Sequence, residues 1–215
     1  MESLPSVIHE TWHPYLFPLF QTNGMNYIKR YLEREEFLPK AKDIFNVFSM
    51  PLNEIKVIIL GQDPYPTPGD AIGYAFAVSE STKKPPSLRM IEKEVGHEID
   101  RTLKPWRDQG VFLLNTALTV KPKSAASHLT MWNGFTSHVI RIISEHKTAI
   151  WLLWGKYAQR FAPIITNYSD NQIILQSPHP AAEVYAGGKA GFIGCGHFNI
   201  VNQILAKTNQ EQIKF

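Results

Sequence analysis

Residues 57–70 read VIILGQDPYPTPGD, and this stretch decides how the rest of the chain is interpreted. It begins with an apolar, β-branched run of the kind found in strands that are buried on both faces. Gly61 ends the run, and a proline-rich loop follows in which Asp63 precedes Pro64. Prolines fix φ, so this loop has few conformations to lose on folding. A carboxylate just beyond the carboxyl end of a buried strand lies where open α/β sheets bind ligands. A simple turn, whose aspartate bonds only its own backbone, is the alternative.

The composition is that of a single globular domain. The chain has 215 residues, of which 44% are hydrophobic and 12% aromatic, enough for a substantial core. We therefore expect one domain over residues 1–215, with a helical amino-terminal part at 1–50 and a core that carries the site at 55–205. The formal charge of +3 permits an anionic partner, but it is not the basic stripe that marks a nucleic-acid-binding protein by itself.

Cysteine content and hydropathy indicate the compartment. Cys195 is the only cysteine, which excludes an intrachain disulfide and a cysteine-based zinc site. The amino terminus lacks the basic and apolar segments of a signal peptide, and no apolar run reaches membrane-spanning length. We therefore expect a cytoplasmic protein with no membrane partner.

Three further apolar runs resemble the first one. They are Val111–Leu114, Ala149–Trp154 and Gln172–Gln176. Segments with helical spacing separate the four runs, including one after paired prolines whose apolar face extends to Ile99, and a closing helix is expected at 195–207. Strands that alternate with helices predict an α/β fold, here a central four-stranded parallel sheet with helices on both faces.

Polar side chains follow three of these strands. The first strand runs into Asp63, the second into Asn115 and the fourth into His179. Because the carboxyl ends of parallel strands lie at one edge of the sheet, the three side chains should meet in a crevice. An acid, an amide and an imidazole without metal-ligand spacing indicate a catalytic set rather than a metal site. Each also has an ordinary structural alternative, as turn former, strand cap or buried core histidine.

No G-x-S-x-G, GxxxxGK[ST] or GxGxxG motif is present, which argues against serine hydrolases, P-loop enzymes and dinucleotide oxidoreductases. A series of other motifs occurs in one order: GQDPY (61–65), PPSLR (85–89), LLNTALTV (113–120), SHLTMW (127–132), LLWGKYAQ (152–159), SPHP (177–180) and GCGHF (194–198). Together they resemble the family 1 uracil-DNA glycosylases, with a match over roughly residues 55–205. The resemblance implies an enzyme that flips uracil out of DNA and hydrolyses its N-glycosidic bond, leaving free uracil and an abasic site, without cofactor or metal.

The resemblance also implies a role for each residue of the expected site. Ionised Asp63 would stabilise positive charge on the sugar and orient or deprotonate the attacking water, while neutral His179 would donate a hydrogen bond to uracil O2. Asn115 would read uracil N3–H and O4, which cytosine presents with the opposite donor pattern. Uracil would further contact Tyr65, which blocks a methyl group at C5, Phe76, which stacks on the base, and the backbone of Gln62.

DNA is the partner that the resemblance implies, both single- and double-stranded when it contains uracil, together with a protein inhibitor that mimics DNA. The backbone of the DNA would contact Pro85, Pro86, Ser87, Ser177 and Ala181. Nearby lysines would either add attraction or form a solvated rim; they are Lys83, Lys84, Lys121 and Lys123. One enzyme acting on one extruded base needs no symmetry, so we expect a monomer.

The sequence departs from the usual family pattern in two places. Pro66 replaces a histidine and so removes a polar group near the attacking water. After Pro180 the chain reads AAEVYAGGKAGFIG, about three residues longer than the usual Ser-Pro-Leu-Ser continuation, whose leucine wedges into the duplex. Here Val184 or Tyr185 would be the wedge. We expect Glu183 to bring a negative charge toward DNA and the loop glycines to make this segment flexible.

Other functions remain open from the sequence. A related glycosylase with a broadened or mismatch preference is one, although Tyr65 and Asn115 resemble strict uracil selectors. A DNA-binding or polymerase-tethering module of the same fold with weak glycosylase activity is another. A small-molecule α/β binding protein would release no uracil and bind no oligonucleotide.

Overall fold

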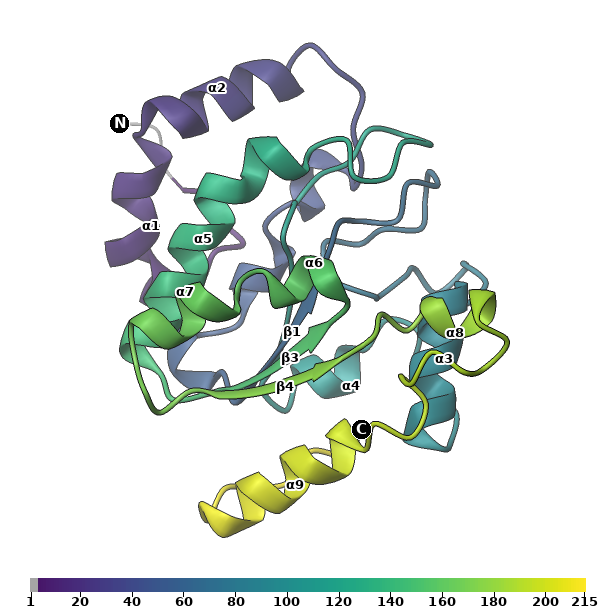
Figure 1. Cartoon of the computed structure of the whole chain (residues 1–215). Coiled ribbons are helices and arrows are strands. Elements are labelled where there is room, and N and C mark those ends of the chain that lie inside the picture. Colours follow the sequence, from purple (N-terminus) through teal and green to yellow (C-terminus); the bar gives the residue numbers. More distant parts are fainter. Residues whose placement is uncertain (1–3) are drawn as a thin grey trace.

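Four parallel strands form the centre of the computed structural model, which describes residues 4–215 (Figure 1). Their order across the sheet is β2-β1-β3-β4. The strands are β1 (Val57–Gly61), β2 (Val111–Asn115), β3 (Ile150–Trp154) and β4 (Ile173–Ser177). The predicted parallel sheet is confirmed, and three of the strands extend one residue further than predicted.

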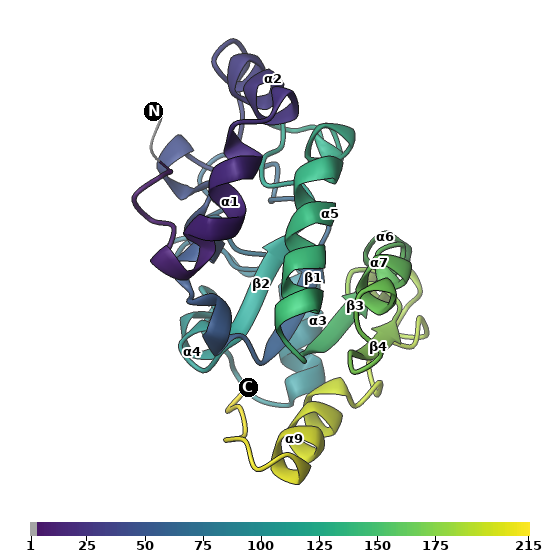
Figure 2. The ribbon, with the colours of Figure 1, turned by 90° about the vertical axis from the view of Figure 1, so that its left-hand side faces the viewer.

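Helices cover both faces of this sheet, as predicted. On one side lie α1 (His13–Phe20), α2 (Asn23–Leu32), α5 (Leu129–His146), α6 (Lys156–Gln159) and α7 (Ala162–Asn167). On the other lie α3 (Pro86–Val95), α4 (Lys104–Arg107) and α9 (His197–Lys207). Figures 1 and 2 show α1, α2 and α5 gathered on one side and α9 on the opposite one. The remaining helices are α8 (Ala182–Tyr185) and four 3-10 turns at Glu10–Trp12, Ala41–Asp43, Asn46–Ser49 and Leu52–Glu54.

Each strand contributes side chains to two separate cores, because successive residues of a strand point to opposite faces. In β1, Ile58 and Leu60 pack into the core beneath α1, α2 and α5. Val57 and Ile59 pack into the core beneath α3, α4 and α9. All five residues of β1 are buried, which explains why this run is apolar throughout rather than alternating.

Two expectations about local structure require correction. The helix after the paired prolines ends at Val95 rather than continuing to Ile99, because Gly96 adopts φ 92° and terminates it in the left-handed conformation. Ile99 is nevertheless buried in the same core. In the amino-terminal part, α1 and α2 are the regular helices, while the chain beyond Pro39 forms only short 3-10 turns; residues 1–3 lie outside the described residues.

The strand order places a topological switch at β1. The chain leaves β1 to form β2 on one side, and it then returns to form β3 on the other side. Open α/β sheets bind ligands outside the carboxyl ends of the strands at such a switch. No helix in the described part of the chain is long and apolar enough to span a bilayer.

Candidate active site

A cavity of about 210 Å³ lies at the carboxyl ends of β1, β2 and β4. The structure brings Asp63, Asn115 and His179 together in its lining, although they are far apart in the chain. The rest of the lining is Gly61, Gln62, Pro64, Tyr65, Pro66, Phe76 and Ser87. The cavity is smaller than the roughly 300–1,000 Å³ of pockets for drug-sized ligands, so its size suits a single ring.

Two hydrogen bonds hold the carboxylate of Asp63. The Gln62 side-chain amide donates to Oδ1 over 3.1 Å, and the Ala126 backbone N–H donates to Oδ2 over 2.5 Å. Burial raises the pKa of Asp63, and these two donors oppose that shift. Gln62 was expected to contribute mainly backbone donors, and the contact from Ala126 was not expected, because a residue 63 positions further along the chain gives no local signal.

Asn115 is buried at the end of β2, beside Gly61 at the end of β1. A Cβ atom at residue 61 would lie 2.4 Å from Asn115 Oδ1 and 2.8 Å from the Cβ of Ala75. The side-chain amide of Asn115 therefore occupies space that only a glycine at 61 leaves free. This gives the glycine of the GQDPY motif a packing function in addition to ending the strand.

The His179 ring is held in one orientation by its own loop. The Ala181 backbone N–H donates to Nδ1 over 3.1 Å, so the neutral imidazole carries its proton on Nε2. Burial lowers the pKa of His179, which favours the neutral form. Gly155 lies against this residue: a Cβ there would be 2.8 Å from the His179 Cβ. The N–H of Ala181 is thus used within the protein, and the contact of this residue with DNA stays a prediction.

Phe76 lies next to the histidine, with ring centroids 5.8 Å apart. Its backbone has φ 62°, a left-handed conformation that costs energy for a residue with a side chain. The Phe76 carbonyl accepts a hydrogen bond from the Tyr65 hydroxyl over 3.3 Å. Residues 73–78 form no regular strand, and the Phe76 ring lies in the cavity wall.

Tyr65 connects the cavity to the start of α3. Its hydroxyl lies 2.8 Å from Ser87 Oγ, and burial raises the pKa of the phenol. Ser87 is itself buried, at 5% exposure, directly after Pro85 and Pro86. Its hydroxyl, expected to contact a phosphate, is thus engaged with Tyr65, and the contacts of this segment with DNA stay a prediction.

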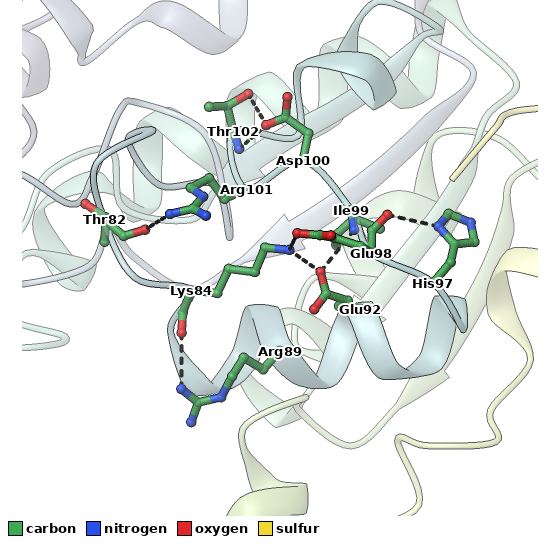
Figure 3. A network of polar contacts seen from close by, with 10 residues as sticks. All are labelled: Thr82, Lys84, Arg89, Glu92, His97, Glu98, Ile99, Asp100, Arg101 and Thr102. Atoms are coloured by element: carbon green, nitrogen blue, oxygen red, sulfur yellow. Dashed lines mark hydrogen bonds and ion pairs between the residues drawn. The ribbon is translucent and has the colours of Figure 1, made fainter.

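Lys84, just before these prolines, is an ion-paired residue (Figure 3). Its ammonium group bonds the Glu92 carboxylate and lies 3.7 Å from Glu98. Figure 3 also shows Arg101 donating to the carbonyl of Thr82, over 2.7 Å. Of the two roles considered for Lys84, attraction of DNA or a solvated rim, neither describes it well. Its charge is neutralised and secures the loop ahead of α3.

Glu183 has a different position from the one expected. Its side chain is 2% exposed and accepts hydrogen bonds from the backbone N–H groups of Ala190, Phe192 and Ile193. These donors, led by Ile193, lower the pKa of Glu183. The expectation that Glu183 presents a negative charge to DNA is wrong, because the carboxylate is turned inward. It closes the loop after His179 and ties its two ends together.

The two wedge candidates lie on α8, within this closed loop. Val184 is 45% exposed and Tyr185 is 89% exposed.

Ser177 ends β4 and is buried, with its hydroxyl donating to the carbonyl of Pro178 over 3.1 Å. Across the described residues, no cluster of three His, Cys, Asp or Glu side chains is arranged to hold a metal ion.

Comparison with known proteins identifies relatives of the whole chain. The chain matches the family model of the uracil DNA glycosylase superfamily over residues 49–206. It is 38% identical to the uracil-DNA glycosylase of Halalkalibacterium halodurans over 221 aligned positions, covering 97% of this chain and 96% of that protein. It is 42% identical to the uracil-DNA glycosylase of Yersinia pseudotuberculosis serotype O:3 over 185 positions, covering 81% and 79%.

Solved structures share the fold. The crystal structure of mimivirus uracil-DNA glycosylase superimposes with a TM-score of 0.86 at 23% identity, covering 99% of this chain and 88% of that one. A variant of mimivirus UNG in complex with UGI gives a TM-score of 0.87, also at 23% identity, over 99% and 90%. UNG from Nitratifractor salsuginis gives 0.65 at 22% identity, over 90% and 91%. With the family model and the curated relatives, these findings establish that the chain belongs to the uracil DNA glycosylase superfamily.

Proposed function

We propose that this protein is a DNA repair enzyme that excises uracil from DNA by hydrolysing its N-glycosidic bond. The observation that carries the proposal is the shared cavity of Asp63, Asn115 and His179. Family membership supports the same activity. DNA containing uracil, as a single strand or a duplex, is the proposed substrate.

In the proposed reaction, the bond between sugar C1′ and uracil N1 breaks and its electron pair leaves with the base. The cationic sugar is stabilised by ionised Asp63, and water adds to C1′ while transferring a proton to the Asp63 carboxylate. The negative charge that builds on the uracil is met by the Nε2–H of neutral His179. The hydrogen bond from Ala181 to Nδ1 supports this assignment, because it leaves Nε2 as the donor.

Base recognition is proposed to depend on Asn115 with Tyr65 and Phe76 as the cavity walls. The buried amide of Asn115 would accept from N3–H and donate to O4 of uracil, and cytosine would leave those buried groups unpaired. Tyr65 would exclude the methyl group of thymine, and Phe76 would stack on the base. The small cavity volume supports a flipped-out base as its occupant.

Contact with the duplex is proposed at two places. The start of α3, with Pro85, Pro86 and Ser87, and the segment from Ser177 to Ala181 would lie against phosphates. Tyr185 or Val184 would enter the space left by the uracil. The exposure of Tyr185 supports the assignment, since a wedge must be free to leave solvent and insert between bases. One cavity accepts one extruded base, so a monomer is proposed, and the mimivirus complex supports a UGI-like partner.

The decisive experiment is uracil release from a single-stranded oligonucleotide by purified protein in the presence of a chelator. We expect free uracil, no release of thymine or cytosine, and no activity on a G·T mismatch. His179→Ala and Asp63→Asn provide the controls for contamination. Oligonucleotide binding without uracil release would instead identify a DNA-binding module, and release of thymine from mismatches would identify a broadened glycosylase.

A further inference from the structure

A loop at residues 121–128 crosses the Asp63 loop and contacts it twice through backbone groups. The Lys123 N–H donates to the carbonyl of Pro66 over 2.8 Å. The Ala126 N–H donates to Oδ2 of Asp63 over 2.5 Å. The first contact fixes the spacing of the two loops, and the second acts directly on the carboxylate.

The backbone of this loop is strained at both contact residues. Lys123 has φ 61° and Ala126 has φ 67°, and both therefore adopt the left-handed region without being glycine. Such conformations persist only where surrounding interactions hold them, and they concentrate at functional sites. The strain at Ala126 turns its N–H toward Asp63.

A buried hydrogen-bond chain anchors the carboxyl end of the loop. The fully buried hydroxyl of Thr119 accepts from the Trp132 indole N–H over 2.7 Å. It is therefore free to donate its own proton to Nδ1 of His128, which lies 2.9 Å away. Burial lowers the pKa of His128 and so favours the neutral imidazole, which can accept this proton at Nδ1. His128 is 2% exposed and lies only two residues after Ala126 in the chain.

We propose that Ala126 is a positioning residue for the reaction, whose backbone N–H orients the Asp63 carboxylate, and that the hydrogen bonds joining Thr119, His128 and Trp132 hold it there. The inference rests on the proposed function. It explains how Asp63 keeps a fixed orientation although Pro66 offers it no side-chain hydrogen bond.

Burial and the hydrogen bonds from Ala126 and Gln62 are what shift the pKa of Asp63, so the loss of the Ala126 N–H should be measurable. Tyr65 and His179 are the other titratable groups of the cavity, and burial disfavours the charged form of each. In the crossing loop, Lys121 lies 3.9 Å from Glu35. The remaining donor is the neutral amide of Gln62.

The test replaces one amide by an ester, which removes a single N–H and leaves every side chain in place. Substituting lactic acid for Ala126 deletes the donor to Asp63. Lactic acid in place of Ala125 is the matched control, because the Ala125 N–H makes no hydrogen bond with the described residues. The first readout is the titration of the Asp63 side-chain carboxyl carbon by NMR.

We expect the ester at 126 to raise the pKa of Asp63 and the ester at 125 to leave it unchanged, because a donor to a carboxylate favours its ionised form. An unchanged pKa in the 126 ester overturns the inference, whether or not the protein releases uracil. Absence of uracil release from the unmodified protein overturns the proposed function instead, so the two failures are distinguishable.

The second readout is the pH dependence of uracil release. In the 126 ester, kcat/KM should fall about 10- to 100-fold on the acid side of the profile, the range expected for one hydrogen bond to a charged group, with a smaller loss at alkaline pH where Asp63 is ionised in both proteins. A loss equal at all pH values would show a structural defect and contradict the positioning role.

The anchor is tested with two substitutions at His128. His128→Asn keeps an acceptor near the place of Nδ1, whereas His128→Leu removes it. We expect the leucine variant to reproduce the acid-side loss of the 126 ester and the asparagine variant to recover most of it, at matched thermal stability. Equal profiles for the two variants would show that the hydrogen bond from Thr119 does not hold the loop.

Discussion

The loop after β1 and the loop after β4 both border the same cavity, yet they are held by different means. Residues 61–66 include two prolines. In this loop the Gln62 side chain donates a hydrogen bond to Asp63, and the Tyr65 hydroxyl bonds Ser87 in α3. Residues 180–193 are glycine-rich and close through one buried carboxylate, that of Glu183. In each loop a departure from the family pattern is predicted, namely Pro66 in the first and additional residues in the second.

The difference separates two tasks. The groups proposed to act on the uracil include Asp63 on the first loop, Asn115 at the end of β2 and His179 just beyond β4. Such groups work best when neighbouring contacts fix their positions. The exposed Tyr185 lies on the short helix of the second loop, where length can change without moving the cavity. Chemistry and duplex contact should therefore respond separately to substitution.

The largest effect is expected for Asp63→Asn. The substitution removes the negative charge that faces the cationic sugar while keeping the shape of the side chain. Uracil release from single strands should fall about 10²–10⁴-fold, the usual range for losing an acid–base group. A quantitative assay with a radiolabelled oligonucleotide measures it, and a loss below threefold would show that the first loop does not carry the chemistry.

Gly61→Ala should be next. Its new Cβ would lie 2.4 Å from Asn115 Oδ1, so the amide must move, and we expect about a 10²-fold loss in kcat/KM because a displacement near 1 Å can cost that much. Gly134→Ala is the control, since a Cβ there meets nothing within 4 Å inside α5. The control should keep full activity and gain about 0.5–1 kcal/mol in unfolding free energy.

The pH profile sharpens the assignment of protonation states in the cavity. Burial raises the pKa of Asp63 from its ordinary value of 3.8 and lowers that of His179 from 6.5. The reaction needs ionised Asp63 and neutral His179, so activity is lost as pH falls through either value. We expect the acid limb of kcat/KM between these two ordinary values, with about tenfold loss per pH unit below it. A limb centred above 6.5 would contradict a lowered pKa for His179.

Replacing Val184 and Tyr185 together by alanine tests the second loop. Duplex substrates should lose about tenfold in kcat/KM, because a stacked aromatic is worth about 1–3 kcal/mol, whereas single strands should lose little. Parallel assays on the same uracil-containing strand, alone and annealed, give the ratio. Equal losses on both substrates would reject a wedge on α8. They would show that the second loop affects the chemistry as well as the contact with the duplex.

The smallest effect is expected for Glu183→Gln. The amide keeps one acceptor oxygen but loses the charge that holds several N–H groups, so the loop should open more often while the cavity is unchanged. Hydrogen exchange at Ala190, Phe192 and Ile193 should accelerate, and duplex activity should fall a few-fold. Unchanged exchange would show that the carboxylate is not what closes the loop.

The sequence predicted the sheet and the meeting of Asp63, Asn115 and His179 because both follow from local pattern and parallel topology. Four buried runs separated by helices allow few arrangements, and the polar residue after each strand then has a defined edge. The end of α3 was predicted too late, because the apolar spacing continues past Gly96 into a turn.

Contacts between distant loops escaped prediction. Nothing in the local sequence indicates that the N–H of Ala126 reaches Asp63, or that Gln62 uses its side chain. The inward orientation of Glu183 was also missed, since a carboxylate in a glycine-rich loop is usually exposed, and its donors lie seven to ten residues away. Such contacts depend on three-dimensional loop paths rather than on residue type.

The hydrogen bond between Tyr65 and Ser87 affects how variants of this enzyme should be interpreted. This hydrogen bond joins Tyr65, which is proposed to discriminate between bases, to the helix that is proposed to contact the sugar–phosphate chain. A substitution at Ser87 intended to weaken affinity for DNA would also remove a hydrogen bond from Tyr65. Selectivity for uracil over other bases should then change together with the affinity for DNA. A selection for tighter or weaker grip at this point would therefore also select for altered accuracy.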